Sequence, residues 1–122
     1  MAELILTFID KFKEIYPDEL EDLFSDGWCY YFAVMLRARF GGRIYYSPIE
    51  NHFVCKIGDL LYDINGINIS EEAVPWDEYK YQDILHEKRI IRDCIMKLTW
   101  GIAWNYILKI ISLYLNLYLL EQ

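Results

Sequence analysis

Three residues in the first half of the chain have the types required for thiol chemistry: Cys29, His52 and Asp63. Cys29 follows the break Ser25-Asp26-Gly27 and begins an apolar stripe with helical spacing. The unpaired N–H groups at a helix N-terminus favour an anion, which lowers the pKa of a cysteine placed there. The same N–H groups can stabilise an oxyanion during acyl transfer. We therefore predict that Cys29 can act as a nucleophile.

His52 and Asp63 lie on two strand-like runs that are joined by Gly58-Asp59, a pair typical of a two-residue hairpin turn. This turn places Val54 opposite Asp63. Because side chains alternate between the two faces of a strand, His52 and Asp63 share one face and are diagonal neighbours. Packing of the helix on the sheet is expected to bring Cys29 towards that face. His52 would then be the general base, and Asp63 would orient its ring.

The same residues also permit interpretations without catalysis. Cys29 could be a buried core thiol, His52 a hydrogen-bonded strand histidine and Asp63 a carboxylate that stabilises a turn. Cys55 is predicted on the face opposite His52, which makes the two a poor metal pair. No phosphate loop, nucleotide fingerprint or acidic metal loop is found, so we expect no metal and no cofactor. Trp28, next to Cys29, could wall a substrate groove.

The elements that must position these residues follow from hydrophobic periodicity and from Pro and Gly signals. Apolar spacing predicts three helices and, between the second and the third, three strands. A short helical segment is also expected after Pro17. The helices are expected at 1–16, 28–39 and 81–97, the strands at 43–47, 51–57 and 60–64, and short helical turns at 70–72 and 75–78.

The C-terminal segment 98–120 is strongly apolar and contains one charge, Lys109. Its length would permit a bilayer span, but a central lysine and two asparagines are costly in lipid. We favour a buried helix or helix–strand element. A membrane anchor and an oligomer-forming helix remain the alternatives.

Length and composition limit the class of protein. The chain has 122 residues, of which 55% are hydrophobic, so we expect one folded domain over 1–122 rather than disorder. A net charge of −7 argues against binding to a nucleic-acid backbone. Three cysteines without metal-ligand spacing argue against a disulfide framework and against a zinc ribbon. With Glu3 in the first segment and no cleavage site, no signal peptide is predicted, and we expect a cytoplasmic protein.

The segment Gly27-Trp28-Cys29-Tyr30-Tyr31-Phe32-Ala33 resembles the Gly-x-Cys motif of papain-like cysteine peptidases and, equally, that of transglutaminase-like proteins. The runs Asn51-His52-Phe53-Val54 and Leu61-Tyr62-Asp63 are more similar to the transglutaminase order because their spacing is compact. The resemblance covers about residues 26–67. It implies a nucleophile at Cys29, a base at His52 and an orienting acid at Asp63.

The resemblance also implies an α+β fold with a papain/transglutaminase-like core. In such a fold a central helix packs on a small antiparallel sheet, with N- and C-terminal helices around it. One departure is the absence of a glutamine upstream of Cys29, where papain-like peptidases place an oxyanion-hole side chain; Leu23 occupies that neighbourhood.

Two functions from different classes follow. The leading interpretation is an enzyme for thiol-dependent acyl chemistry, that is, hydrolysis or transfer at an amide or ester, with a peptide or protein as substrate. The alternative is a non-catalytic protein that keeps the scaffold and binds a protein partner. A small acidic inhibitor from a virus or mobile element would have such a sequence, since residues 1–26 carry eight acidic and two basic side chains.

Overall fold

The computed structural model describes residues 1–15, 29–79 and 84–95 and shows an α+β fold. Trp28, the segment after Pro17 and the apolar segment 98–120 lie outside the described residues, as does the outer part of the helix expected at 81–97. The elements, in chain order, are α1 (Ala2–Ile15), α3 (Cys29–Phe40), β1 (Arg43–Ser47), β2 (His52–Ile57), β3 (Leu60–Asp63), β4 (Gly66–Asn68), β5 (Val74–Pro75), the 3₁₀ turn η2 (Trp76–Glu78), α4 (Ile84–Ile90) and the π-helical turn η3 (Ile91–Ile95).

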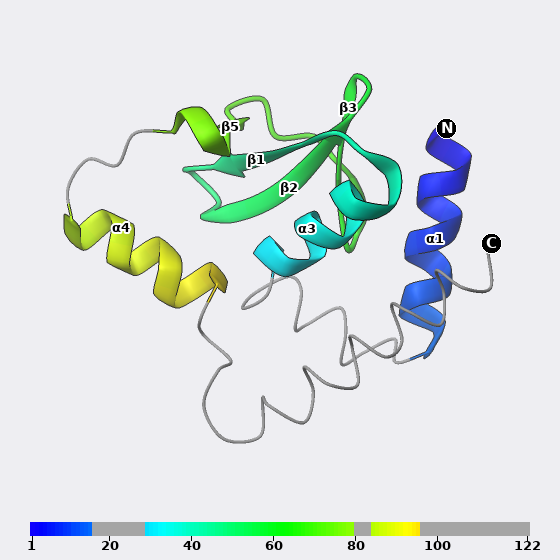
Figure 1. Ribbon diagram of the computed structural model, residues 1–122, viewed down its shortest axis with the longest axis horizontal. Coiled ribbons are helices and arrows are strands. Elements are labelled where there is room, and N and C mark those ends of the chain that lie inside the picture. The colour runs from blue at the N-terminus through cyan, green and yellow to red at the C-terminus, as the bar shows by residue number, and fades with distance from the viewer. Residues whose placement is uncertain (16–28, 80–83, 96–122) are drawn as a thin grey trace.

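The five strands form one antiparallel sheet in the order β4-β3-β2-β1-β5, with α3 lying across it (Figure 1). The predicted β2–β3 register is confirmed, since Cys55 pairs with Tyr62 and Ile57 with Leu60. Gly58 adopts a φ of 63° at the turn, a conformation that glycine reaches without steric cost. The hairpin that carries His52 and Asp63 is therefore the predicted one.

Helix α3 ends at Phe40, one residue beyond the predicted end, and two glycines follow it. Gly41 has a φ of 84°, and its N–H donates to the carbonyl of Arg37 at 2.8 Å. A Cβ at Gly42 would collide with the carbonyl oxygen of Lys56, so glycine is required where the chain turns from α3 into β1. This tight connection holds α3 against the strand that follows.

The core lies between α3 and the sheet face that carries Phe53, Cys55 and Ile57. Cys29, Phe32, Ala33 and Leu36 of α3 are buried there, as the helical stripe predicted. Aromatic side chains of α1, including Phe8 and Phe12, close the same core from one side.

The sheet face that α3 covers differs from the one we predicted. α3 covers the face that carries Phe53, Cys55 and Ile57, because that face is uniformly apolar. His52 and Asp63 lie on the opposite face, which also carries Lys56. Cys29 still reaches His52, since it is the first residue of α3 and lies at the end of the sheet where β2 begins.

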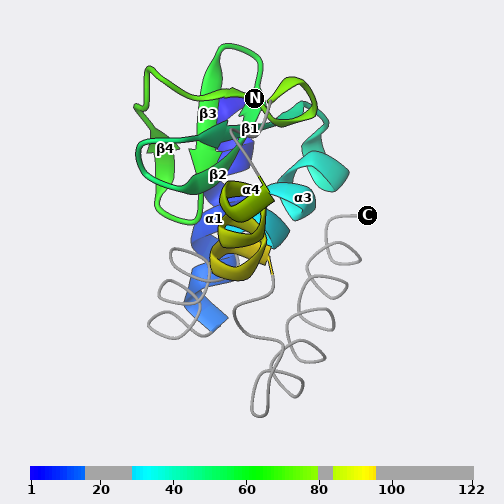
Figure 2. The same cartoon turned by 90° about the vertical axis from the view of Figure 1, so that its left-hand side faces the viewer.

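The α4–η3 helix approaches the same end of α3, as the two perpendicular views show (Figures 1 and 2). Two further differences from prediction concern short elements. Residues 71–72 form a bend rather than a helical turn, and β4 and β5 were not predicted as strands. Within the described residues, no helix has the length and apolarity to cross a bilayer.

Candidate active site

Cys29 opens α3, the position expected for it. The thiol is buried, with the residue 2% exposed, and its sulfur accepts a hydrogen bond from the backbone N–H of Phe53 at 3.5 Å. Phe53 is the second residue of β2. This contact therefore ties the first turn of the helix to the strand that carries His52.

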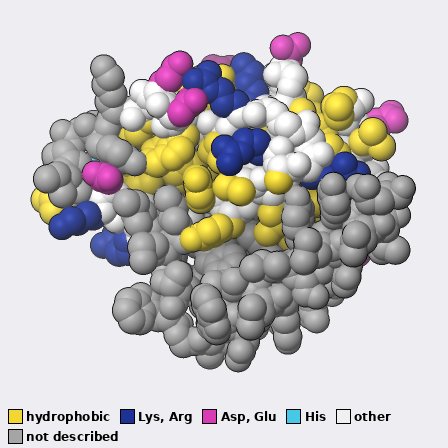
Figure 3. Space-filling model, in the orientation of Figure 1, with side chains coloured by type: hydrophobic (Ala, Val, Ile, Leu, Met, Phe, Trp, Pro, Cys, Tyr) yellow, Lys and Arg dark blue, Asp and Glu magenta, His cyan; other side chains and the backbone are white. Residues whose placement is uncertain are grey.

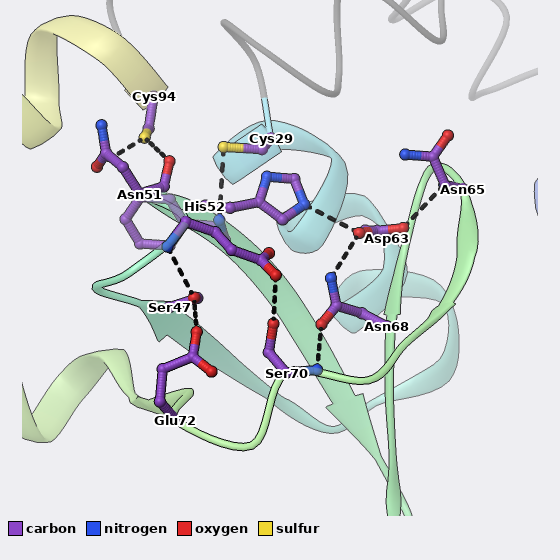
Figure 4. Close-up of polar contacts among 12 residues, drawn as sticks. Cys29, Ser47, Asn51, His52, Asp63, Asn65, Asn68, Ser70, Glu72 and Cys94 are labelled. Atoms are coloured by element: carbon purple, nitrogen blue, oxygen red, sulfur yellow. Dashed lines mark hydrogen bonds and ion pairs between the residues drawn. The ribbon is translucent and has the colours of Figure 1, made fainter.

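His52 and Asp63 are brought together as predicted. His52 Nε2 lies 3.0 Å from Asp63 Oδ2, and the two residues are 8% and 6% exposed. The ring of His52 lies between the sulfur of Cys29 and the carboxylate of Asp63 (Figure 4). Because Nε2 faces Asp63, Nδ1 is the nitrogen that remains to exchange a proton with the thiol.

The carboxylate of Asp63 is fixed by further donors. Oδ1 accepts the backbone N–H of Asn65 at 2.8 Å, and Oδ2 accepts Nδ2 of Asn68 at 3.0 Å. The amide of Asn68 is itself oriented, since its Oδ1 accepts the N–H of Ser70 at 2.8 Å. Asp63 thus holds the His52 ring with a carboxylate that has little freedom to rotate.

The contacts favour an ion pair between Cys29 and His52. The pKa of Cys29 is lowered to about 5. The largest cause is a hydrogen bond with the Cys94 thiol; burial raises the pKa, and the hydrogen bond and positive charge of His52 lower it further. Burial lowers the pKa of His52, but its hydrogen bonds to Asp63 and Cys29 outweigh this and raise it to about 10. Burial raises the pKa of Asp63, and its bonds to His52 and Asn68 lower it by more.

Cys55 shows what the same burial does without such neighbours. It is 0% exposed, its S–H donates to the carbonyl of Gly41 at 3.7 Å, and burial raises its pKa to about 11. A low thiol pKa is therefore a property of the position of Cys29 and not of burial in this core.

A hollow of about 270 Å³ opens beside the His52–Asp63 pair and is lined by Glu50, His52, Asp63, Asn65 and Asn68. Its lining is mostly polar, and it lies next to the ring that would carry the proton. No group of three side chains that could hold a metal ion occurs among the residues that the structure describes. Trp28, the residue expected to wall a groove, lies outside them.

A family model described as Phage YunG-like protein matches residues 8–95. The match covers more than half of the chain and includes all of the residues described for this site. The chain belongs to the phage YunG-like protein family. No curated protein and no solved structure gives a significant match to this family member.

Two residues of the site were not predicted from sequence. Asn68 lies on β4, which the turn at Ile64-Asn65 joins to β3. The pairing of Asp63 with Gly66 sets Asn68 opposite Leu61, on the face of Asp63. Cys94 lies in η3 and is buried. Nothing in the local sequence indicated that it would meet Cys29, which lies far away in the chain.

Proposed function

We propose that this protein performs thiol-dependent acyl chemistry, the hydrolysis or transfer of an amide or ester, on a papain/transglutaminase-like core. The observation that carries the proposal is the buried 3.0 Å contact of His52 Nε2 with Asp63, with the Cys29 thiol beside the same ring. A nucleophile, a base and a group that orients the base are the three parts that such chemistry requires.

In the first step, the thiolate of Cys29 attacks the acyl carbon of the substrate. The carbonyl oxygen gains the negative charge, which N–H groups in the first turn of α3 would stabilise. The bond from carbon to the leaving nitrogen or oxygen then breaks, and the imidazolium of His52 donates its Nδ1 proton to the leaving group. The product is a thioester on Cys29.

In the second step, neutral His52 removes a proton from water or from an acceptor amine, which attacks the thioester and releases the thiolate. Asp63 remains a carboxylate throughout and stabilises the imidazolium, which is present in the resting pair and forms again when His52 takes the proton of the water or amine. The hollow beside His52 is polar, so it would admit the water or amine. The substrate class that we propose is a peptide or protein.

One observation favours the second candidate, a non-catalytic acidic protein that binds a protein partner. Cys29 is only 2% exposed, and a nucleophile must meet its substrate. Charge grouping does not add to this argument on the face shown in Figure 3, because acidic and basic side chains of the described residues are mixed there with apolar ones. A binder of this kind from a virus or mobile element would agree with the phage description of the family.

Hydrolysis of p-nitrophenyl acetate separates the two candidates. The enzyme should release p-nitrophenol over many turnovers, and an added primary amine should accelerate the release if transfer is the activity. Cys29→Ala should abolish turnover, whereas Cys55→Ala, which removes an equally buried thiol outside the site, should retain it. Circular dichroism of each variant would show that the fold is kept. Equal turnover by Cys29→Ala and wild type would support the binding protein.

A further inference from the structure

A second thiol lies against the candidate nucleophile. Cys94 is 0% exposed, and its sulfur lies 3.2 Å from the carbonyl oxygen of Asn51, while the sulfur of Cys29 lies 3.5 Å from the N–H of Phe53. Asn51 and Phe53 flank His52, so both sulfurs rest on the same short stretch of backbone. In Figure 4 both sulfurs lie beside Asn51 and His52, and Cys94 is the largest influence that lowers the pKa of Cys29.

The backbone around Cys94 is irregular in a way that places the thiol. Residues Ile91–Ile95 form a π-helical turn, a rare geometry that is frequent at functional sites. Asn51, its partner, has a φ of 51° and is held by the hydroxyl of Tyr46 at 2.6 Å and by contact of its Nδ2 with Asp93 at 3.3 Å. These contacts hold Cys94 at the site.

We propose that Cys29 and Cys94 form a hydroperoxide-sensitive pair that closes into a disulfide. The proposal rests on the contacts that the two thiols make with residues 51–53, and it does not require the acyl chemistry. Cys94 would be the resolving thiol, and hydrogen peroxide, which is small enough to enter a buried site, would be the oxidant.

The reaction balances in two steps. The thiolate of Cys29 attacks one oxygen of the peroxide, the O–O bond breaks, and hydroxide leaves and is protonated to water; Cys29 becomes a sulfenic acid. The sulfur of Cys94 then attacks the sulfenic sulfur, the S–O bond breaks, and a second water leaves with the proton of Cys94. Two electrons pass from the two thiols to the peroxide. The disulfide would block the nucleophile until a dithiol reduces it.

Cys55 is an internal control. It is as buried as Cys94, but its raised pKa of about 11 keeps it protonated, and it lies at the carbonyl of Gly41 rather than beside another thiol. Thiolate character, together with a neighbouring thiol, should therefore decide which of the three cysteines react.

Intact mass and peptide mapping of the full chain after brief exposure to hydrogen peroxide test the proposal. The wild type should lose the mass of two hydrogen atoms, regain it with dithiothreitol, and yield one cross-linked peptide pair containing Cys29 and Cys94, with Cys55 free. Cys94→Ser should form no disulfide and should instead accumulate a sulfenic acid at Cys29 that dimedone traps. Cys55→Ser should behave as the wild type.

Three outcomes would overturn the proposal: a wild-type chain that stays fully reduced, a disulfide that contains Cys55, or a disulfide between two chains. Because the readout is the mass of the protein, a chain without esterase activity that still forms the Cys29–Cys94 bond would count against the proposed function alone.

Discussion

Replacement of His52 by alanine should raise the pH at which Cys29 becomes a reactive thiolate. In the wild type the pKa of Cys29 is about 5, and the hydrogen bond and positive charge of His52 contribute to that value. Loss of an opposite charge at contact distance shifts a pKa by about two units, so the midpoint of alkylation should move to about pH 7. It should remain below the ordinary value because the larger contribution, the bond from Cys94, is kept.

The size of the effect decides how it must be measured. At pH 5 the wild-type thiol is about half ionised and the variant about one part in a hundred, a difference of about fifty-fold. A more basic thiolate is intrinsically more reactive, which reduces the difference in rate to about six-fold. At pH 7 the same correction makes the variant as fast as the wild type or faster. A rate at one pH is therefore misleading, and the whole profile is needed.

The assay is alkylation by iodoacetamide from pH 4 to pH 10, with each cysteine followed by peptide mass spectrometry. His86→Ala is the matched control, because His86 is the other histidine of the chain and contacts Tyr79 and Arg89 rather than Cys29. It should leave the Cys29 midpoint unchanged. The reasoning is refuted if wild-type Cys29 reacts with a midpoint near 9.0, or if His52→Ala leaves the midpoint where it was.

Three further outcomes are expected. In the unfolded chain the pKa values of His52 and Cys29 return to 6.5 and 9.0. From about pH 5 to 6.5 the unfolded chain therefore holds one proton more than the folded chain, on Cys29, and from pH 9.0 to about 10 the folded chain holds one more, on His52. Thermal melts should therefore show stability that rises with pH across the first window, is level between the two, and falls across the second. Cys29→Ser/His52→Gln should lack the rise and should show a weaker fall, because Cys55, whose pKa is raised to about 11, still contributes to the fall above pH 9.0. Asn68→Ala removes the Nδ2 donor of Asp63 and should raise the Cys29 alkylation midpoint by less than His52→Ala does, whereas Asn65→Ala keeps its backbone bond to Asp63 and should not. Leu36→Ala empties a fully buried position of α3 and should lower the free energy of unfolding by about 2–5 kcal/mol in urea titrations, and an effect below about 1 kcal/mol would contradict the packing of α3 on the sheet.

The parts of the fold that sequence predicted are those with a local physical signal. Gly58-Asp59 sets the register of β2 and β3, and that register alone places His52 and Asp63 together. The glycines after α3 end the helix because only they fit the left-handed conformation and the close approach to Lys56. Turn residues and strand alternation thus sufficed to predict that His52 and Asp63 lie together.

The parts that sequence missed depend on distant contacts. β4 and β5 have three and two residues, too few to show alternation, and β5 contains a proline. Cys94 meets Cys29 only because the α4–η3 helix folds back to the end of α3. The face of the sheet that α3 covers was wrongly predicted, because the face that carries Phe53, Cys55 and Ile57 is apolar throughout and the face of His52 also carries Lys56.

The most direct test of the proposed function is the detection of an acyl group on Cys29. The full chain would be mixed with p-nitrophenyl acetate, quenched in acid at short times, and digested for mass spectrometry. The account predicts an acetyl thioester on Cys29 that appears before steady turnover, is absent in Cys29→Ala and forms more slowly at pH 5 in His52→Ala. Acetyl groups on surface lysines alone, with Cys29 unmodified at every time, would contradict it.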